Sequence, residues 1–348
     1  MLTRRDLTRL AALGGAALAA SPTAAGPAAA KPRPPLVKPK RLSPGDTLGL
    51  VLPAGSEPTW SKLDLAREQL QALGFRVKLG EHARRQHGYF AGTDAERAAD
   101  VNAMFADPEV AGVICYTGGW GTPRILPLVD FATIRKNPKV VVGFSDITAL
   151  LNAVTQETGL VTFHAPVGGS QLRPWTLERW KKALMSGEPP GVLANPPKND
   201  DELVPRTWRT VTLRGGRARG RLAGGNLTLL SALMGTPWEI DAEGAILLIE
   251  DVDEAPYRID RMLTQLALGG KLERVAGVVF GFCTECEAEG TSFSLEEVLR
   301  DRLEPLGVPV LTGFAFGHIG LQHTLPIGLP ATLDADAGTL TIEEAAVV

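Results

Sequence analysis

Segment 140–150 places a serine where a nucleophile would stand. A β-branched run ends at Gly143, Ser145 follows, and a helix-like pattern starts at Asp146. This layout predicts a sharp strand-to-helix turn, with the hydroxyl near backbone N–H groups that could hold an oxyanion. A helix cap stays open as the alternative, since Ser and Asp are common N-cap residues. The nucleophile pattern is also incomplete, because Ile147 stands where G-x-S-x-G has its second glycine.

A serine hydroxyl is a weak nucleophile and needs a base, and the chain has five histidines. His82 and His87 lie in an arginine-rich polar loop and are predicted to be solvated. His164 follows an apolar strand pattern, which indicates a core or site-wall residue. His323 stands in a polar stretch, where a structural or solvated role is expected. His318 lies between two glycines that let backbone and ligand approach closely, so it is a candidate base.

The orienting acid has several candidates in one short segment. An apolar strand pattern at 247–249 runs into Glu250, Asp251, Asp253 and Glu254. Glu250 comes first and is therefore best placed to be partly buried beside an imidazole. A charge near the N-terminus of a following helix is an equally open interpretation of Glu250.

Segment 116–121 is a glycine-rich turn between a strand pattern and a helix pattern. A phosphate loop is not indicated, because G-x-x-x-x-G-K-[ST] is absent from the sequence. Gly118 and Gly119 could instead present a backbone N–H to Ser145, with Trp120 as an apolar wall for substrate. An ordinary tight turn remains the alternative.

Strand-like and helix-like segments alternate through the first half of the chain, which predicts a mostly parallel sheet covered by helices. Ligands then bind beyond the carboxyl ends of the strands, where the serine and the glycine turn would lie. The second half mixes short strands with helices. The predicted segments are a signal peptide at 1–30, a linker at 31–43, an N-terminal α/β domain at 44–173, an interdomain connection at 174–209 and a C-terminal domain at 210–345.

The first thirty residues predict export. Arg4 and Arg5 precede a short apolar run and small residues up to Ala30, which is typical of a signal peptide and favours the twin-arginine route. The apolar run is too short to span a bilayer. A periplasmic or otherwise exported protein without a membrane anchor is therefore expected.

Charge and cysteine content exclude some classes of function. The formal net charge of −3 and the lack of a basic stripe argue against a nucleic-acid surface. Cys283 and Cys286 have a metal-ligand spacing, but no second pair stands at a matching distance. A disulfide or two plain thiols is expected there, and no metal site.

The ordered motifs resemble the LD-carboxypeptidases (muramoyltetrapeptide carboxypeptidases), serine peptidases of peptidoglycan recycling. The resemblance covers roughly residues 44–340. It rests on segments 88–97, 118–121, 143–146, 224–227, 235–237, 249–252, 256–263, 317–318 and 324–328.

The resemblance implies a triad of Ser145, His318 and Glu250, in which the histidine moves the proton and the glutamate fixes its tautomer. Backbone N–H groups of Asp146 and of the Gly118–Gly119 turn would hold the oxyanion. The family fold implies a Rossmann-like parallel-sheet domain and a smaller C-terminal α+β, barrel-like domain, with the site between them. It also implies no cofactor, a peptidoglycan tetrapeptide or muropeptide as substrate, and a homodimer.

Two departures from the family pattern are visible. Thr117 stands where the family often has Arg, and Ala165 replaces a glycine after His164. Arg258 is a candidate for gripping the terminal carboxylate, because Arg suits bidentate contacts with carboxylates.

Two further functions stay open. One is an amide hydrolase like the microcin C immunity enzymes, which cleave acyl-adenylate analogues in the cytoplasm; the predicted export signal counts against it. The other is a catalytically inactive muropeptide-binding protein, against which the complete triad argues.

Overall fold

The structure is a computed structural model that describes residues 32–348, of which 33–348 form one compact unit. The predicted signal peptide lies outside the described residues. Among residues 32–348, no helix is both long and apolar enough to cross a membrane.

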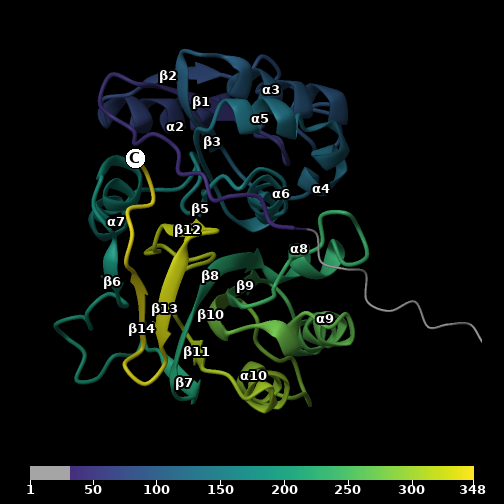
Figure 1. Cartoon of the computed structure of the whole chain (residues 1–348), viewed down its shortest axis with the longest axis vertical. Helices are drawn as coiled ribbons and strands as arrows, with labels where there is room; N and C mark the ends of the chain where they lie inside the picture. Colours follow the sequence, from purple (N-terminus) through teal and green to yellow (C-terminus); the bar gives the residue numbers. More distant parts are fainter. Residues whose placement is uncertain (1–31) are drawn as a thin grey trace, which may run out of the picture. The chain divides into compact units, whose positions relative to one another are not determined.

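The first sheet carries the predicted nucleophile. Within residues 32–348 it has six strands in the order β12-β5-β4-β3-β1-β2. Neighbours are parallel except for β12, which pairs antiparallel with β5. The predicted mostly parallel sheet is thus confirmed (Figure 1). Its strands are β1 Thr47–Val51, β2 Arg76–Leu79, β3 Val110–Cys115, β4 Val140–Gly143, β5 Thr162–His164 and β12 Leu325–Ile327.

Helices cover both faces of this sheet. Side chains of α3, α5 and α6 share one apolar cluster with the strands, and those of α2 and α7 share another. Thr93 caps α3 through a capping box with Glu96. The helices are α2 Trp60–Ala72, α3 Asp94–Ala106, α4 Thr122–Ile125, α5 Phe131–Lys136, α6 Thr148–Thr158 and α7 Pro174–Met185.

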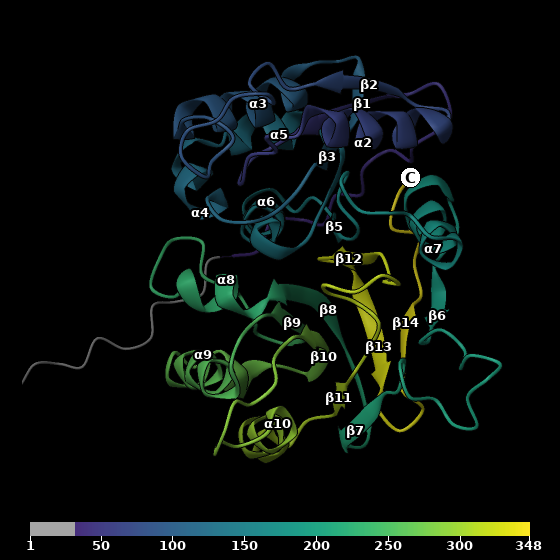
Figure 2. The same cartoon turned by 180° about the vertical axis from the view of Figure 1, so that it is seen from behind.

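The second sheet is mixed. Within the described part of the chain it has eight strands in the order β6-β14-β13-β8-β9-β10-β11-β7, with β8 to β11 parallel and the outer pairs antiparallel. Its strands are β6 Gly191–Leu193, β7 Val211–Arg214, β8 Arg217–Asn226, β9 Ala245–Val252, β10 Gly277–Thr284, β11 Val310–Thr312, β13 Pro330–Asp334 and β14 Thr339–Ile342. Its helices are α8 Leu227–Ala232, α9 Pro256–Leu268 and α10 Leu295–Leu303. Helices α9 and α10 lie beside the second sheet (Figure 2), and an apolar cluster joins them to β9 and β10.

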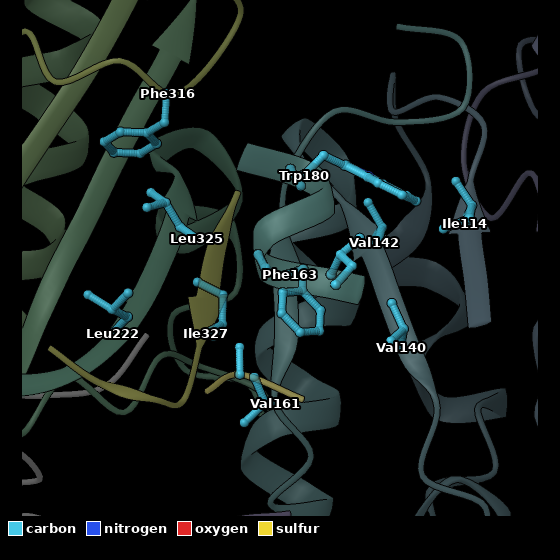
Figure 3. Packing of buried hydrophobic residues seen from close by; sticks show 14 of the residues in the cluster. Ile114, Val140, Val142, Val161, Phe163, Trp180, Leu222, Phe316, Leu325 and Ile327 are labelled. Carbon is cyan, nitrogen blue, oxygen red and sulfur yellow. The ribbon is translucent and has the colours of Figure 1, made fainter. Parts of the chain in front are cut away.

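Strand β12 joins the two sheets. It belongs to the C-terminal part of the sequence but hydrogen-bonds to β5 of the first sheet. Figure 3 shows Leu325 and Ile327 of β12 between Leu222 of β8 and Phe163 of β5. All four side chains are buried in one cluster. Because apolar burial contributes roughly 25 cal/mol per Å², this shared core fixes the strand ends that carry the site.

Several predicted features differ in the structure. The expected linker is anchored, because Val37 forms a β-bridge with Leu160 and hydrogen-bonds to Gly159. The expected connection at 174–209 contains α7 and β6. His82 is not simply solvated, because its Nδ1 lies 2.8 Å from an Asp100 carboxylate oxygen.

The cysteines also have a defined state. Cys283 and Cys286 form a disulfide at the end of β10, which decides between the two alternatives left open by the sequence. Cys115 is free and buried. Across residues 32–348, no group of three or more His, Cys, Asp or Glu side chains is arranged to hold a metal ion.

Candidate active site

Three side chains from distant parts of the sequence form one hydrogen-bonded chain. The Nε2 of His318 lies 2.9 Å from the Oγ of Ser145, and its Nδ1 lies 2.8 Å from the Oε2 of Glu250. Ser145 follows β4, Glu250 lies in β9, and His318 lies in the loop between β11 and β12. The structure therefore brings together the serine, base and acid that the resemblance implies.

The turn at Ser145 is sharp. Its φ is +62°, a left-handed conformation that non-glycine residues rarely adopt. A 3-10 turn over Ser145–Ile147 leads into α6. Ile147 is fully buried, and a Cβ at Gly143 would lie 2.4 Å from its Cγ2. Ile147 therefore occupies the position of the second glycine in the nucleophile pattern. Its side chain packs against Gly143, the first glycine of that pattern. A strained serine on such a turn is typical of a nucleophile.

The glycine turn lies against the serine. A Cβ at Gly118 would come within 3.0 Å of the Oγ of Ser145 and 3.1 Å of the backbone nitrogen of Asp146. The Gly118 carbonyl accepts a hydrogen bond from the Gly55 N–H, which holds the turn against the loop after β1. The backbone of Asp146 and the Gly118–Gly119 turn therefore flank the serine hydroxyl, as an oxyanion site requires.

The Asp146 side chain holds the residue that follows the glycine turn. Its Oδ2 accepts a 2.7 Å hydrogen bond from the N–H of Thr122 at the start of α4. The side chain is fully buried, and this burial raises the pKa of its carboxyl group. The buried guanidinium of Arg97 donates to the carbonyls of Pro53 and Gly121. These contacts fix the C-terminal end of the glycine turn, at Gly121 and Thr122.

Glu250 lies buried beside the imidazole of His318. Its side chain is 0% exposed, at the point where β9 pairs with Asn226 of β8. A Cβ at Gly317 would lie 2.9 Å from the Oε2 of Glu250, so the glycine lets the histidine loop approach. The hydroxyl of Thr284 donates to the His318 carbonyl at 2.9 Å and steadies that loop.

Asp251 faces the other side of β9, as the alternation of a strand requires. Its carboxylate accepts hydrogen bonds from the Asn226 side-chain amide and the Thr228 N–H. Burial, with a smaller contribution from Glu250, raises the pKa of Asp251 to about 6. Asp251 thus anchors the start of α8.

His164 forms the wall behind the site. It is fully buried, and its ring lies 6.0 Å from that of Phe144 and 5.5 Å from that of Phe316. Burial lowers the pKa of His164 to about 4, which keeps the imidazole neutral. Phe144 also packs edge-on against His318, with ring centroids 4.9 Å apart. His164 is therefore the core or site-wall residue that the sequence indicates.

A cavity of about 370 Å³ opens beside the imidazole of His318. Arg173, which directly precedes the proline that opens α7, lines it, although no pattern in the sequence singled out this residue. Trp120 and Arg258 are not among the described residues that line this cavity. Trp120 is 41% exposed beside the glycine turn, and Arg258 contacts Glu254 and Tyr257. Their roles in substrate binding stay predictions. A larger cavity, of about 670 Å³, lies beside α7 and includes no triad residue.

Known proteins are similar to both halves of this chain. Residues 48–165 match the family model of the LD-carboxypeptidase N-terminal domain, and residues 219–333 match that of the C-terminal domain. A probable murein peptide carboxypeptidase of Bacillus subtilis is 45% identical over 88% of this chain and 94% of the relative. The murein tetrapeptide carboxypeptidase of Pseudomonas aeruginosa is 31% identical over 83% of this chain and 93% of its own. The microcin C7 self-immunity protein MccF of Escherichia coli is 30% identical over 87% of this chain and 94% of its own.

Solved structures are similar over most of the chain. The MccF protein in its wild-type apo state matches with a TM-score of 0.81 and 27% identity, over 90% of this chain and 100% of the other. A muramoyltetrapeptide carboxypeptidase from Oxalobacter formigenes matches with a TM-score of 0.72 and 32% identity, over 85% and 97%. With both halves matched and relatives aligned across nearly their whole length, this chain belongs to the LD-carboxypeptidase family.

Proposed function

We propose that this protein is a serine-type LD-carboxypeptidase that releases the terminal D-alanine of peptidoglycan tetrapeptides. It would hydrolyse the amide between an L-centre, diaminopimelate or lysine, and that D-alanine. The hydrogen-bonded chain Ser145–His318–Glu250 carries this proposal. The 45% identity to a probable murein peptide carboxypeptidase supports the choice of substrate class.

The geometry supports a two-step mechanism. His318 Nε2 takes the proton of Ser145 while Oγ attacks the amide carbonyl, and the backbone N–H groups beside Gly118 hold the oxyanion. The imidazolium then gives its proton to the departing amine of D-alanine, which leaves an acyl-enzyme on Ser145. Water, deprotonated by the same imidazole, hydrolyses the ester. Glu250 keeps the proton on Nδ1 and stabilises the imidazolium.

Product analysis tests this proposal directly. Purified protein is incubated with a defined tetrapeptide, free or attached to its disaccharide, and with a diastereomer that ends in L-alanine. Release of D-alanine and tripeptide, with the L-alanine peptide left intact, is the expected result. Tight binding without turnover would instead support an inactive muropeptide-binding protein and contradict the enzyme proposal.

A second candidate function has its own supporting observation. The MccF structure aligns over 90% of this chain and 100% of its own with a TM-score of 0.81. An amide hydrolase acting on acyl-adenylate analogues is therefore the alternative. Measuring kcat/KM for the tetrapeptide and for an aminoacyl sulfamoyl adenosine in parallel separates the two functions. A higher value for the adenosine compound would overturn the carboxypeptidase proposal.

We propose further that the protein is exported and forms a homodimer. The arginine pair and short apolar run at the start of the sequence support export, as does the Cys283–Cys286 disulfide, since disulfides persist in oxidising compartments. Family resemblance alone supports the dimer. Cell fractionation with an Arg4→Lys/Arg5→Lys variant tests export, and light scattering tests the dimer.

A further inference from the structure

The cavity beside His318 lies on the leaving-group side of the site. In a triad the imidazole passes its proton to the departing amine, so the leaving group must lie against the imidazole. Phe144 and His318 both line the cavity, and both adjoin Ser145. Its volume of about 370 Å³ exceeds what one small amino acid requires. If the protein releases D-alanine, this cavity is where the D-alanine would sit.

Arg173 supplies a positive charge to this cavity. Among the described residues that line it, only Arg173 and His318 bear ionisable side chains. The Arg173 guanidinium lies against the histidine loop, since a Cβ at Gly320 would be 3.5 Å from its Cζ. Within residues 32–348, this guanidinium makes no hydrogen bond or ion pair, whereas Arg258 contacts a carboxylate. An unpaired guanidinium beside a cavity is well suited to bind a carboxylate in bidentate fashion.

Two neighbouring features favour an amino acid as the occupant. Arg173 is the N-cap of α7, a helix of twelve residues whose N-terminus favours a negative charge. Gln322 lines the same cavity and is only 3% exposed, and its Oε1 has no partner among the described residues. A buried amide oxygen is expected to have a hydrogen-bond donor, and an amine N–H is one. The guanidinium and the amide oxygen thus suit the two ends of an amino acid.

We propose that Arg173 binds the terminal α-carboxylate of the substrate and makes the enzyme a carboxypeptidase rather than an endopeptidase. This inference rests on the proposed function. It replaces Arg258, the candidate from the sequence, with a residue that borders the catalytic histidine. Arg173 is a specificity residue here, because it holds the substrate and takes no part in moving the proton.

The test compares a tetrapeptide with its C-terminal carboxamide, which lacks the negative charge. The wild-type protein is expected to prefer the free acid, in kcat/KM, by about 10- to 100-fold, the range for a charge-assisted contact. Arg173→Met should remove most of this preference, because kcat/KM for the free acid should fall much further than kcat/KM for the carboxamide. Arg173→Lys should restore part of the preference. Arg206→Met, at an exposed arginine that does not line the cavity, is the matched control.

The possible results separate the inference from the function. If the wild-type protein cleaves neither peptide, the proposed function and the inference both fall. If it cleaves the acid selectively and Arg173→Met keeps that selectivity, the inference alone is overturned. Loss of selectivity in Arg258→Met but not in Arg173→Met would assign the contact to Arg258. Thermal unfolding of each variant shows whether a change reflects lost binding or lost folding.

Discussion

Gly118 lies so close to Ser145 that a Cβ at position 118 would come within 2.9 Å of the serine Cβ. The glycine has no side chain where the nucleophile stands, so its turn can present backbone N–H groups to the reacting carbonyl. This contact links β3 and β4 at their carboxyl ends, where ligands bind in parallel sheets.

Gly118→Ala is therefore expected to displace the turn and impair oxyanion stabilisation. Since loss of one oxyanion donor lowers kcat by about 10²–10³, a fall of that order is predicted, with KM little changed. Steady-state kinetics with a tetrapeptide measure it. Gly187→Ala is the control, because a Cβ there would meet only the flexible Arg41 side chain. A Gly118→Ala enzyme as active as wild type would argue against an oxyanion role for the turn.

Because the backbone at Ser145 is left-handed, we expect a glycine at this position to be more stabilising than an alanine. At a φ of +62°, Ser145→Gly should be about 1 kcal/mol more stable than Ser145→Ala, because only glycine adopts this conformation without strain. Chemical denaturation measures both free energies of unfolding. At Ser231, within α8, the order should reverse, since alanine is the better helix former. Equal stability of the two variants at position 145 would show that the turn is relaxed.

Glu250→Gln keeps the shape of the acid and removes its charge. An amide presents a donor to Nδ1 or fails to stabilise the imidazolium, so kcat should fall by about 10³–10⁴. Asp251 lies on the opposite side of β9 and anchors the start of α8. Asp251→Asn should therefore lower the free energy of unfolding and change kcat little. Comparing kcat with the free energy of unfolding for both variants checks this contrast. A kcat within about tenfold of wild type in Glu250→Gln would contradict the orienting role.

Because His323 is buried, we expect the folded protein to lose stability in acid. The imidazole is fully buried, and burial, aided by the nearby Arg179, lowers its pKa to about 3. The unfolded chain takes up this proton below its ordinary pKa of about 6.5, whereas the folded chain does not, so stability falls as the pH drops from 6.5 towards 3. At pH 4.5 the penalty is about 2–3 kcal/mol.

Comparing His323→Gln with wild type isolates this effect. The variant should lose less stability than wild type between pH 7 and 4.5, measured by urea denaturation. His87→Gln, at an exposed histidine, should follow the wild-type curve. Parallel curves for wild type and His323→Gln would mean that His323 is protonated in the folded state as readily as in the unfolded chain.

Local patterns were sufficient to predict the alternation of strands and helices in the first half of the chain. The β-branched run before Gly143 became β4, and the helix-like pattern after Ser145 became the 3-10 turn and α6. The triad, by contrast, was predicted from resemblance, because no spacing in the sequence connects Ser145 with residues 250 and 318. Only the fold brings these strand ends and loops together.

Non-local contacts explain why the sequence did not predict strand β12 or the place of Arg173. Strand β12 has three residues, too few for a periodic signal, and its pairing with β5 depends on the shared apolar core. Arg173 stood at the boundary of a segment expected to be an irregular connection, which instead forms α7. Pro174 at the first helical position was the available signal, since proline favours that position. That signal indicates the helix but not the cavity beside it.

The most direct test of the central claim is the rate of D-alanine release by Ser145→Ala compared with wild type, measured on one defined tetrapeptide. If Ser145 is the nucleophile activated by His318 and Glu250, release should fall by about 10⁶, to the background of the assay, while the variant still binds the peptide. Release at a rate near that of wild type would show that another group cleaves the bond and would contradict the account.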